Sequence, residues 1–291
     1  MNLPRRHFNR AASAAIALVT AFSMVACRHK DEALVTPQQS GPVISGADNA
    51  PEHGFCLYGC PTGAPSSNHV VARSLYVLSN NADTKFSDWV GYRVANDTIG
   101  ETKVRNWHQD PDLPENETLK KSDYKGARQG GLDYDIGHQA PLASLSGHPD
   151  WAETDYLSNT TPQKKYLNEG PWLQLENAER RLVEKYGMTT YTLTGPLYER
   201  EMPNLPNARL DHKVPSGYWK IIAVKDGDSI LTAAFVMDQD MKRRDDYCAT
   251  SVAPRNIETR THLNFFPRMA QEKQDKIETS RGALLPQLGC K

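Results

Sequence analysis

Apolar and polar residues alternate or gather in short runs along most of the chain, and this pattern predicts strands at several places. Residues 70–78 and 89–94 are rich in β-branched and aromatic residues, and residues 79–83 between them have turn-forming side chains. Residues 106–131 are polar and irregular, which indicates a long surface loop. A short strand over residues 132–136 is predicted to follow this loop.

One segment, residues 171–186, has the periodicity of a helix. Pro171 suits the first turn, where a missing N–H costs nothing, and Gly187 suits the C-cap. The apolar side chains that recur at helical spacing are Trp172, Leu175, Leu182 and Tyr186. This is the clearest helix that the sequence predicts.

After this helix, turn residues separate further runs of β-forming residues. Gly195-Pro196 predicts one turn and Asp226-Gly227 predicts a hairpin. The strands expected around these turns are residues 190–194, 218–224 and 230–237. From Asn256 onward we expect one or two short helices. Strands toward both ends with helices between them predict an α+β fold, with a central mixed or antiparallel sheet and flanking helices.

The first 26 residues form an export signal. Arginines near the start precede an apolar run that is too short for a comfortable membrane span. The run ends in Met24-Val25-Ala26-Cys27, which resembles a lipobox with Cys27 as the lipidated residue; plain secretion is the alternative. Arg5-Arg6-His7-Phe8 also resembles a twin-arginine signal, so both export routes stay open. We expect a periplasmic or outer-membrane-anchored lipoprotein, or a secreted protein.

The rest of the chain is expected to hold one domain. Residues 27–52 are polar and aperiodic, which is typical of a flexible tether, and residues 53–291 contain no later linker or repeat. Three arginines and no acids lie in residues 1–26, so removing them leaves 31 basic against 35 acidic residues. A mature charge of about −4 argues against a protein that coats nucleic acid through bulk charge.

The five cysteines also favour export. With Cys27 assigned to lipid, four remain, and these allow three pairings. Cys56 and Cys60 are close enough in sequence to favour a local bridge, and Cys248 and Cys290 would close a long loop. A zinc site is the alternative, but the chain lacks a second CxxC or a paired histidine motif.

The residues from Tyr134 to Pro141 carry the most informative chemistry. His138 is one of nine histidines, and a lone histidine is commonly structural. Here Gly137 is expected to permit a tight turn, Asp135 to help orient the imidazole, and Pro141 to stop the strand. An imidazole near its unperturbed pKa can accept a proton from water at neutral pH.

A second group of polar residues lies around the predicted helix. Asn168 is either an N-cap ahead of Pro171 or a neutral oxygen ligand for Mg²⁺. Glu176 follows eight residues later, roughly 80° around a helix, where it could hold metal-bound water. Glu176 and Arg180 are spaced for a surface ion pair, or for an arginine that faces phosphate. A base, a weak metal ligand and this pair suit metal-assisted cleavage of phosphodiesters.

Residues 135–145, Asp-Ile-Gly-His-Gln-Ala-Pro-Leu-Ala-Ser-Leu, resemble the Asp-Arg-Gly-His motif of the DNA/RNA non-specific endonucleases, the Serratia nuclease group with a ββα-metal (His-Me finger) site. The likeness covers roughly residues 53–291, and the matching segments keep their order and approximate spacing. They are residues 104–107, 156–164, 167–170, 175–180, 194–200, 215–220 and 289–290.

The resemblance implies a role for each matched residue. His138 is the general base, Asn168 binds one Mg²⁺ (with Mn²⁺ as an alternative), and Glu176 orients the metal's waters. Asn159 helps to hold the site, and Arg105 and Arg180 neutralise charge on the phosphoryl oxygens. From the residues alone, Arg105 and Asn159 would be an ordinary surface residue and an ordinary turn residue.

The resemblance also implies the substrates and the covalent framework. It implies cleavage of double- and single-stranded DNA and RNA to 5′-phosphate ends, and two bridges, Cys56–Cys60 and Cys248–Cys290. The absence of a base-reading motif fits backbone recognition. Besides the membrane contact through lipid, a homodimer is a further partner to consider.

One departure from the motif stands at Ile136, where the family has arginine. Loss of a guanidinium beside the scissile phosphate removes a charge-assisted contact. The two interpretations are an active nuclease and a weakened or inactive relative that binds nucleic acid at the cell surface.

Overall fold

The computed structural model describes residues 44–45, 54–101 and 103–291. The predicted export signal, Cys27 and most of the predicted tether lie outside these residues. Within the tether, Ile44–Ser45 forms a two-residue strand, β1, which pairs antiparallel with β2. None of the helices in the described ranges is long and apolar enough to cross a bilayer.

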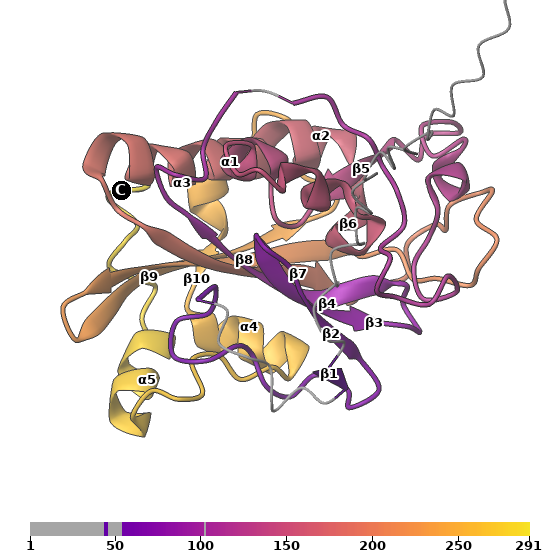
Figure 1. The fold of residues 1–291 in the computed structure, drawn as a ribbon. Coiled ribbons are helices and arrows are strands. Elements are labelled where there is room, and N and C mark those ends of the chain that lie inside the picture. The colour runs from indigo at the N-terminus through magenta and orange to yellow at the C-terminus, as the bar shows by residue number, and fades with distance from the viewer. Residues whose placement is uncertain (1–43, 46–53, 102) are drawn as a thin grey trace, which may run out of the picture. The chain divides into compact units, whose positions relative to one another are not determined.

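The centre of the fold is an eight-stranded sheet in the order β1-β2-β3-β4-β7-β8-β9-β10, and every neighbouring pair is antiparallel (Figure 1). The strands are β2 (His69–Ala72), β3 (Tyr76–Asn81), β4 (Phe86–Val94), β7 (Thr190–Leu197), β8 (Gly217–Asp226), β9 (Ser229–Asp238) and β10 (Ser251–Val252). A separate antiparallel ribbon consists of β5 (Tyr134–His138) and β6 (Thr160–Lys164). The predicted α+β class, with an antiparallel sheet, is confirmed.

Helices cover both faces of the large sheet. In Figure 1, α1 (Leu142–Leu145), α2 (Lys165–Leu167), α3 (Leu173–Tyr186) and the β5–β6 ribbon lie on one side. The helices α4 (Pro254–Thr261) and α5 (Gln271–Glu278) lie on the other. The short 3₁₀ helices are Lys121–Tyr124, Trp151–Asp155, Leu157–Asn159 and Tyr247–Thr250.

Strand β8 shows why the sheet needs two covering layers. Trp219 and Ile221 pack into the core on the α4 side, while Tyr218 and Ile222 pack into the core beneath α3. Successive strand residues point to opposite faces, so the apolar residues on either side of Lys220 are buried against both layers, and Lys220 itself is buried too. The predicted hairpin to β9 is confirmed, with Gly227 at φ 59°.

Two strand predictions were wrong in detail. The run 70–78 is two strands, since β2 ends at Ala72 and the Arg73 N–H donates to the Tyr76 carbonyl at 2.8 Å to form a tight connection. Gly195-Pro196 is not a turn but part of β7, opposite Trp219 and Tyr218. A Cβ on Gly195 would collide with the Asp88 carbonyl oxygen, so this glycine permits close strand packing.

Both predicted disulfides are present. Cys56–Cys60 closes one turn before β2, and Cys248–Cys290 ties the C-terminus to the segment after β9. The second bridge closes a loop over a separation of 42 residues, which restricts the unfolded chain the more strongly. Two disulfides fit a protein exported to an oxidising compartment.

Candidate active site

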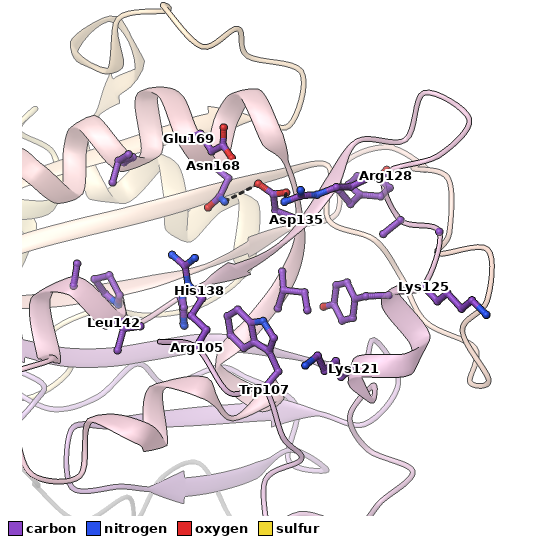
Figure 2. A pocket seen from close by; sticks show the side chains of 18 of the residues that line it. Arg105, Trp107, Lys121, Lys125, Arg128, Asp135, His138, Leu142, Asn168 and Glu169 are labelled. Carbon is purple, nitrogen blue, oxygen red and sulfur yellow. Dashed lines mark hydrogen bonds and ion pairs between the residues drawn. The ribbon is translucent and has the colours of Figure 1, made fainter. Parts of the chain in front are cut away.

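A pocket of about 610 Å³ lies beside the β5–β6 ribbon. Its walls come from the loop before the ribbon, from β5, and from the start of α3 (Figure 2). Of the residues predicted for the site, four line it: Arg105, His138, Asn168 and Glu176. Asn159 and Arg180 lie nearby but are not among the lining residues.

His138 is the last residue of β5, paired with Thr160 of β6, and not a residue of a turn as predicted. Gly137 therefore has a different function from the one expected. It lies within the strand, where a Cβ would be 2.7 Å from the Cβ of Gln163, so only glycine fits. β5 already ends at His138, so Pro141 does not stop the strand as predicted; it is the N-cap of α1, which begins at the next residue.

The imidazole of His138 is held by Asp155 and not by Asp135. Its Nε2 lies 3.2 Å from Asp155 Oδ1, and the Asp155 carboxylate also accepts the Asn106 backbone N–H at 2.5 Å. The Trp107 ring lies against the imidazole, with 4.7 Å between ring centroids. Hydrogen bond and stacking together fix the orientation of the ring.

Burial lowers the pKa of His138 below its ordinary value, and the hydrogen bond and charge of Asp155 oppose this effect. The charge of Arg105 lowers the pKa further. Burial alone would raise the pKa of Asp155, but its hydrogen bonds with His138 and the Asn106 N–H keep it below its ordinary value. The imidazole is thus neutral, and Asp155 ionised, at neutral pH.

Asp135 instead orients Asn168. The Asn168 Nδ2 donates to one Asp135 oxygen at 3.0 Å, and Arg128 pairs with the other, as Figure 2 shows. With Nδ2 engaged, the amide oxygen of Asn168 has no hydrogen-bond partner among the described residues. An amide oxygen held in this way suits a hard cation such as Mg²⁺.

The helix after Asn168 begins later than predicted. Residues Asn168–Trp172 form a π-type turn in which Gly170 has non-helical angles (φ −117°, ψ −118°), and α3 starts at Leu173. Asn168 and Glu176 therefore belong to separate elements, and the pocket rather than a shared helix face brings them together. The predicted end of the helix is confirmed, with Gly187 left-handed at φ 65°.

Glu176 lines the pocket and is 8% exposed. Burial raises its pKa, while the charges of Lys220 and Arg180 oppose the rise. Lys220 is fully buried, donates to the Tyr92 hydroxyl at 2.8 Å, and lies over the Trp172 ring. A buried cation behind the carboxylate helps to keep Glu176 ionised.

The remaining predicted residues support the pocket from outside. The Asn159 amide is fully buried, accepts the Ala140 N–H at 2.8 Å and donates to the Ala140 carbonyl at 3.0 Å, which fixes the chain just after His138. Arg180 donates to Ser144 Oγ at 2.9 Å and to Asn177. No ion pair joins Arg180 to Glu176 among the residues that the structure describes, so the predicted pair is replaced by these contacts.

The described residues contain no cluster of three or more histidine, cysteine, aspartate or glutamate side chains that could hold a metal. A metal here would depend on the Asn168 oxygen, with water as the other ligands. That donor set fits an ion that keeps most of its waters.

Comparison with known proteins identifies the family. A model of the DNA/RNA non-specific endonuclease family matches residues 55–272. The nuclease of Serratia marcescens is 42% identical over 260 residues, which cover 89% of this chain and 95% of that protein. The chain belongs to this family. It is accordingly a nuclease, an enzyme that hydrolyses nucleic acid.

More distant relatives agree with this assignment. Mitochondrial endonuclease G of Bos taurus is 27% identical over 198 residues, covering 60% of this nuclease and 61% of that protein. The solved structure of EndoG in its complex with EndoGI superposes with a TM-score of 0.62 at 24% identity, covering 76% of this chain and 93% of that chain. The latter comparison supports the fold.

Sequence reasoning missed several residues that build the site: Trp107 and Arg128, which line the pocket, and Asp155, which does not line it but holds His138. Asp155 and Trp107 contact His138, and Arg128 pairs with Asp135, but each lies in a segment without periodicity. The available signal for Asp155 was its position directly before the matching segment 156–164. Ile136 does line the pocket, as its place in the motif predicted.

Proposed function

We propose that this nuclease is a Mg²⁺-dependent, sequence-non-specific endonuclease that cuts DNA and RNA to 5′-phosphate ends. The observation that carries the proposal is the convergence of two groups on one pocket. These are the imidazole of His138, oriented by Asp155, and the amide oxygen of Asn168, oriented by Asp135.

His138 acts as the general base. With Nε2–H donating to Asp155, Nδ1 carries the lone pair and can accept a proton from water in the pocket. The lowered pKa of His138 keeps this lone pair available at neutral pH. The Asp155 carboxylate stabilises the imidazolium that forms, as in other histidine–carboxylate pairs.

Endonucleases of this family depend on a metal. In this chain Asn168 would hold Mg²⁺ or Mn²⁺, and Glu176 would hold water in the same pocket. When bound, the cation supplies positive charge that stabilises the leaving 3′ oxygen. The hydrogen bond to Asp135, which also pairs with Arg128, fixes the Asn168 amide whose oxygen would hold the cation.

Two arginines stabilise the charge on the phosphate. Arg105 is exposed and lines the pocket, so it can contact a phosphoryl oxygen. Arg180 is engaged with Ser144 and Asn177, so we assign it a supporting electrostatic role on the Glu176 side. Contacts with phosphate bind the sugar-phosphate backbone of the nucleic acid and do not read its bases. This suits cleavage of double- and single-stranded substrates without sequence preference.

The second candidate function is nucleic-acid binding with weak or no catalysis. Its support is Ile136, an apolar side chain in the pocket where the family motif has arginine. We favour the enzyme because His138, Asn168, Glu176 and Arg105 all line the same pocket.

Membrane attachment and self-association are further parts of the proposal. Lipid on Cys27 would place the enzyme at a membrane, and a Cys27→Ser variant recovered from the soluble fraction would support attachment. Light scattering of the purified domain distinguishes a homodimer from a monomer.

Plasmid digestion tests the function directly. We expect wild-type protein to nick and linearise plasmid with Mg²⁺, to degrade RNA, and to stop in EDTA. Ligation of the fragments without added kinase reports 5′-phosphate ends. Intact plasmid at every Mg²⁺ concentration would favour the binding protein instead.

A further inference from the structure

One wall of the pocket carries three cations within eight residues. Lys121, Lys125 and Arg128 all line the pocket, and all three are exposed. In Figure 2 they lie on the side of the pocket away from Leu142, with His138 and Arg105 between. We call residues 121–128 the basic wall.

The basic wall is anchored by its other side chains. Four apolar or paired side chains in and beside the wall are buried: Leu119, Asp123, Tyr124 and Ala127. The cations at 121, 125 and 128 therefore lie on the opposite, solvent-exposed side, which lines the pocket. Asp123 pairs with Arg209 from a distant loop, and Asn207 donates to the Lys125 carbonyl at 2.6 Å. The Tyr134 N–H donates to the Ala127 carbonyl at 2.9 Å, which ties the wall to β5.

The positive charges of the basic wall are not fully paired with acidic side chains of the protein. Lys121 and Lys125 have no acidic partner in the part of the chain that the structure describes. Arg128 pairs with Asp135, but a guanidinium has five N–H donors, and its side chain is 64% exposed. Asp123, the one acid in residues 121–128, is buried and neutralised by Arg209. Three preformed cations beside a cleavage site fit a chain of phosphates.

We propose that the basic wall is a subsite for the sugar-phosphate backbone flanking the scissile bond, with Arg128 innermost and the two lysines farther out. The inference rests on the proposed function and deepens it. It assigns the substrate class as polynucleotide strands with several phosphates on that side, not small phosphodiesters. Arg128 also links the subsite to Asn168, because the Asp135 carboxylate pairs with Arg128 and accepts a hydrogen bond from the Asn168 amide.

Binding measured without cleavage tests the wall separately from the enzyme's activity. The probe is a fluorescent 20-nucleotide single-stranded DNA in EDTA, followed by anisotropy at several salt concentrations. The variant is Lys121→Ser with Lys125→Ser. The matched control is Lys120→Ser, because Lys120 is the adjacent residue but pairs with Glu115 and does not line the pocket.

We expect the double variant to bind roughly tenfold more weakly near 0.1 M salt. Its salt slope should be smaller by about 1.4, because each phosphate that a lysine no longer neutralises reduces the slope by ~0.7. Lys120→Ser should match wild type in both affinity and slope.

The subsite would be overturned if the double variant bound the DNA as tightly as wild type does. It would also be overturned if Lys120→Ser weakened binding as much as the double variant does. Plasmid cleavage is scored separately from binding. If the wild-type protein does not cleave plasmid, but its DNA binding still weakens when Lys121 and Lys125 are replaced, the proposed enzymatic function fails and the subsite stands.

Discussion

His138 and Asp155 form a hydrogen-bonded pair at the edge of the pocket, with 3.2 Å between Nε2 and Oδ1. The Asp155 side chain is fully buried, and that of His138 is 9% exposed. Because the two residues are 17 apart in sequence, the pair depends on the folding of residues 139–154 between them. This pair decides at which pH the imidazole can act as a base.

Replacement of Asp155 by asparagine should move the acidic limb of the pH–rate profile to lower pH. The base is the neutral imidazole, so activity rises as pH passes the pKa of His138. Burial lowers that pKa and Asp155 raises it, so loss of the charge lowers it further. The profile of kcat/KM measures the shift. Asp150→Asn, near His148, is the control, and a limb that moves upward would contradict the assignment.

Ile136→Arg should make the enzyme faster. Ile136 precedes His138 by two residues in β5, so both side chains leave the strand on the same side. A guanidinium there would add a charge-assisted contact of about 1.5–3 kcal/mol, or roughly ten- to a hundredfold in kcat/KM. Ile136→Leu keeps the shape without the charge and serves as the control. An unchanged or slower rate would show that the site has adapted around isoleucine.

Asn168→Ala should raise the Mg²⁺ concentration needed for half-maximal activity, by about tenfold or more, because the variant loses the protein's direct ligand. A Mg²⁺ titration of plasmid cleavage measures this change, and the thermal midpoint without metal shows that the fold is kept. Asn256→Ala, an exposed change on α4, is the control. The same Mg²⁺ dependence in Asn168→Ala and wild type would exclude Asn168 as the ligand.

Glu278→Gln should stabilise the protein above neutral pH and not at pH 4.5. Burial and the nearby Glu258 carboxylate raise the pKa of Glu278 to about 7, although Arg255 opposes the rise. Between pH 4.5 and 7 the folded state keeps this proton and the unfolded state loses it, so the wild-type free energy of unfolding falls as pH rises through this range. Glutamine does not titrate, so the variant avoids this loss.

Urea unfolding at pH 4.5 and pH 8 measures the effect, which we expect to reach on the order of 2 kcal/mol at pH 8. Glu272→Gln, an exposed change on the same helix, should alter neither value. An equal gain at both pH values would mean that Glu278 is ionised throughout.

The sequence predicted the elements whose signals are local. The hairpin at Asp226-Gly227, the helix end at Gly187 and the Cys56–Cys60 bridge are all present, because turn chemistry, C-cap geometry and close cysteine spacing act over a few residues. The long-range bridge Cys248–Cys290 is also present, but its pairing was implied by the family resemblance. The motif likewise brought His138 and Asn168 into one site. The helix start was misplaced because Pro171 follows a π-type turn at Gly170, which periodicity does not reveal.

Contacts across the fold could not be predicted from such signals. Gly137 and Gly195 were both predicted to be turn residues, but each lies in a strand where a neighbouring side chain or carbonyl leaves no room for a Cβ. Asp135 seemed the natural partner of His138 because it is three residues away. An odd spacing in a strand sends the two side chains to opposite sides, so Asp135 reaches Asn168 and His138 reaches Asp155.

The most direct test of His138 as the general base is the cleavage rate of His138→Ala beside that of His148→Ala. His148 is a partly exposed histidine that does not line the pocket. We expect His138→Ala to lose about 10²–10⁴-fold in plasmid cleavage with Mg²⁺ while its thermal midpoint and DNA affinity stay near wild type, and His148→Ala to keep full activity. Wild-type turnover by folded His138→Ala would contradict the assignment of His138 as the base.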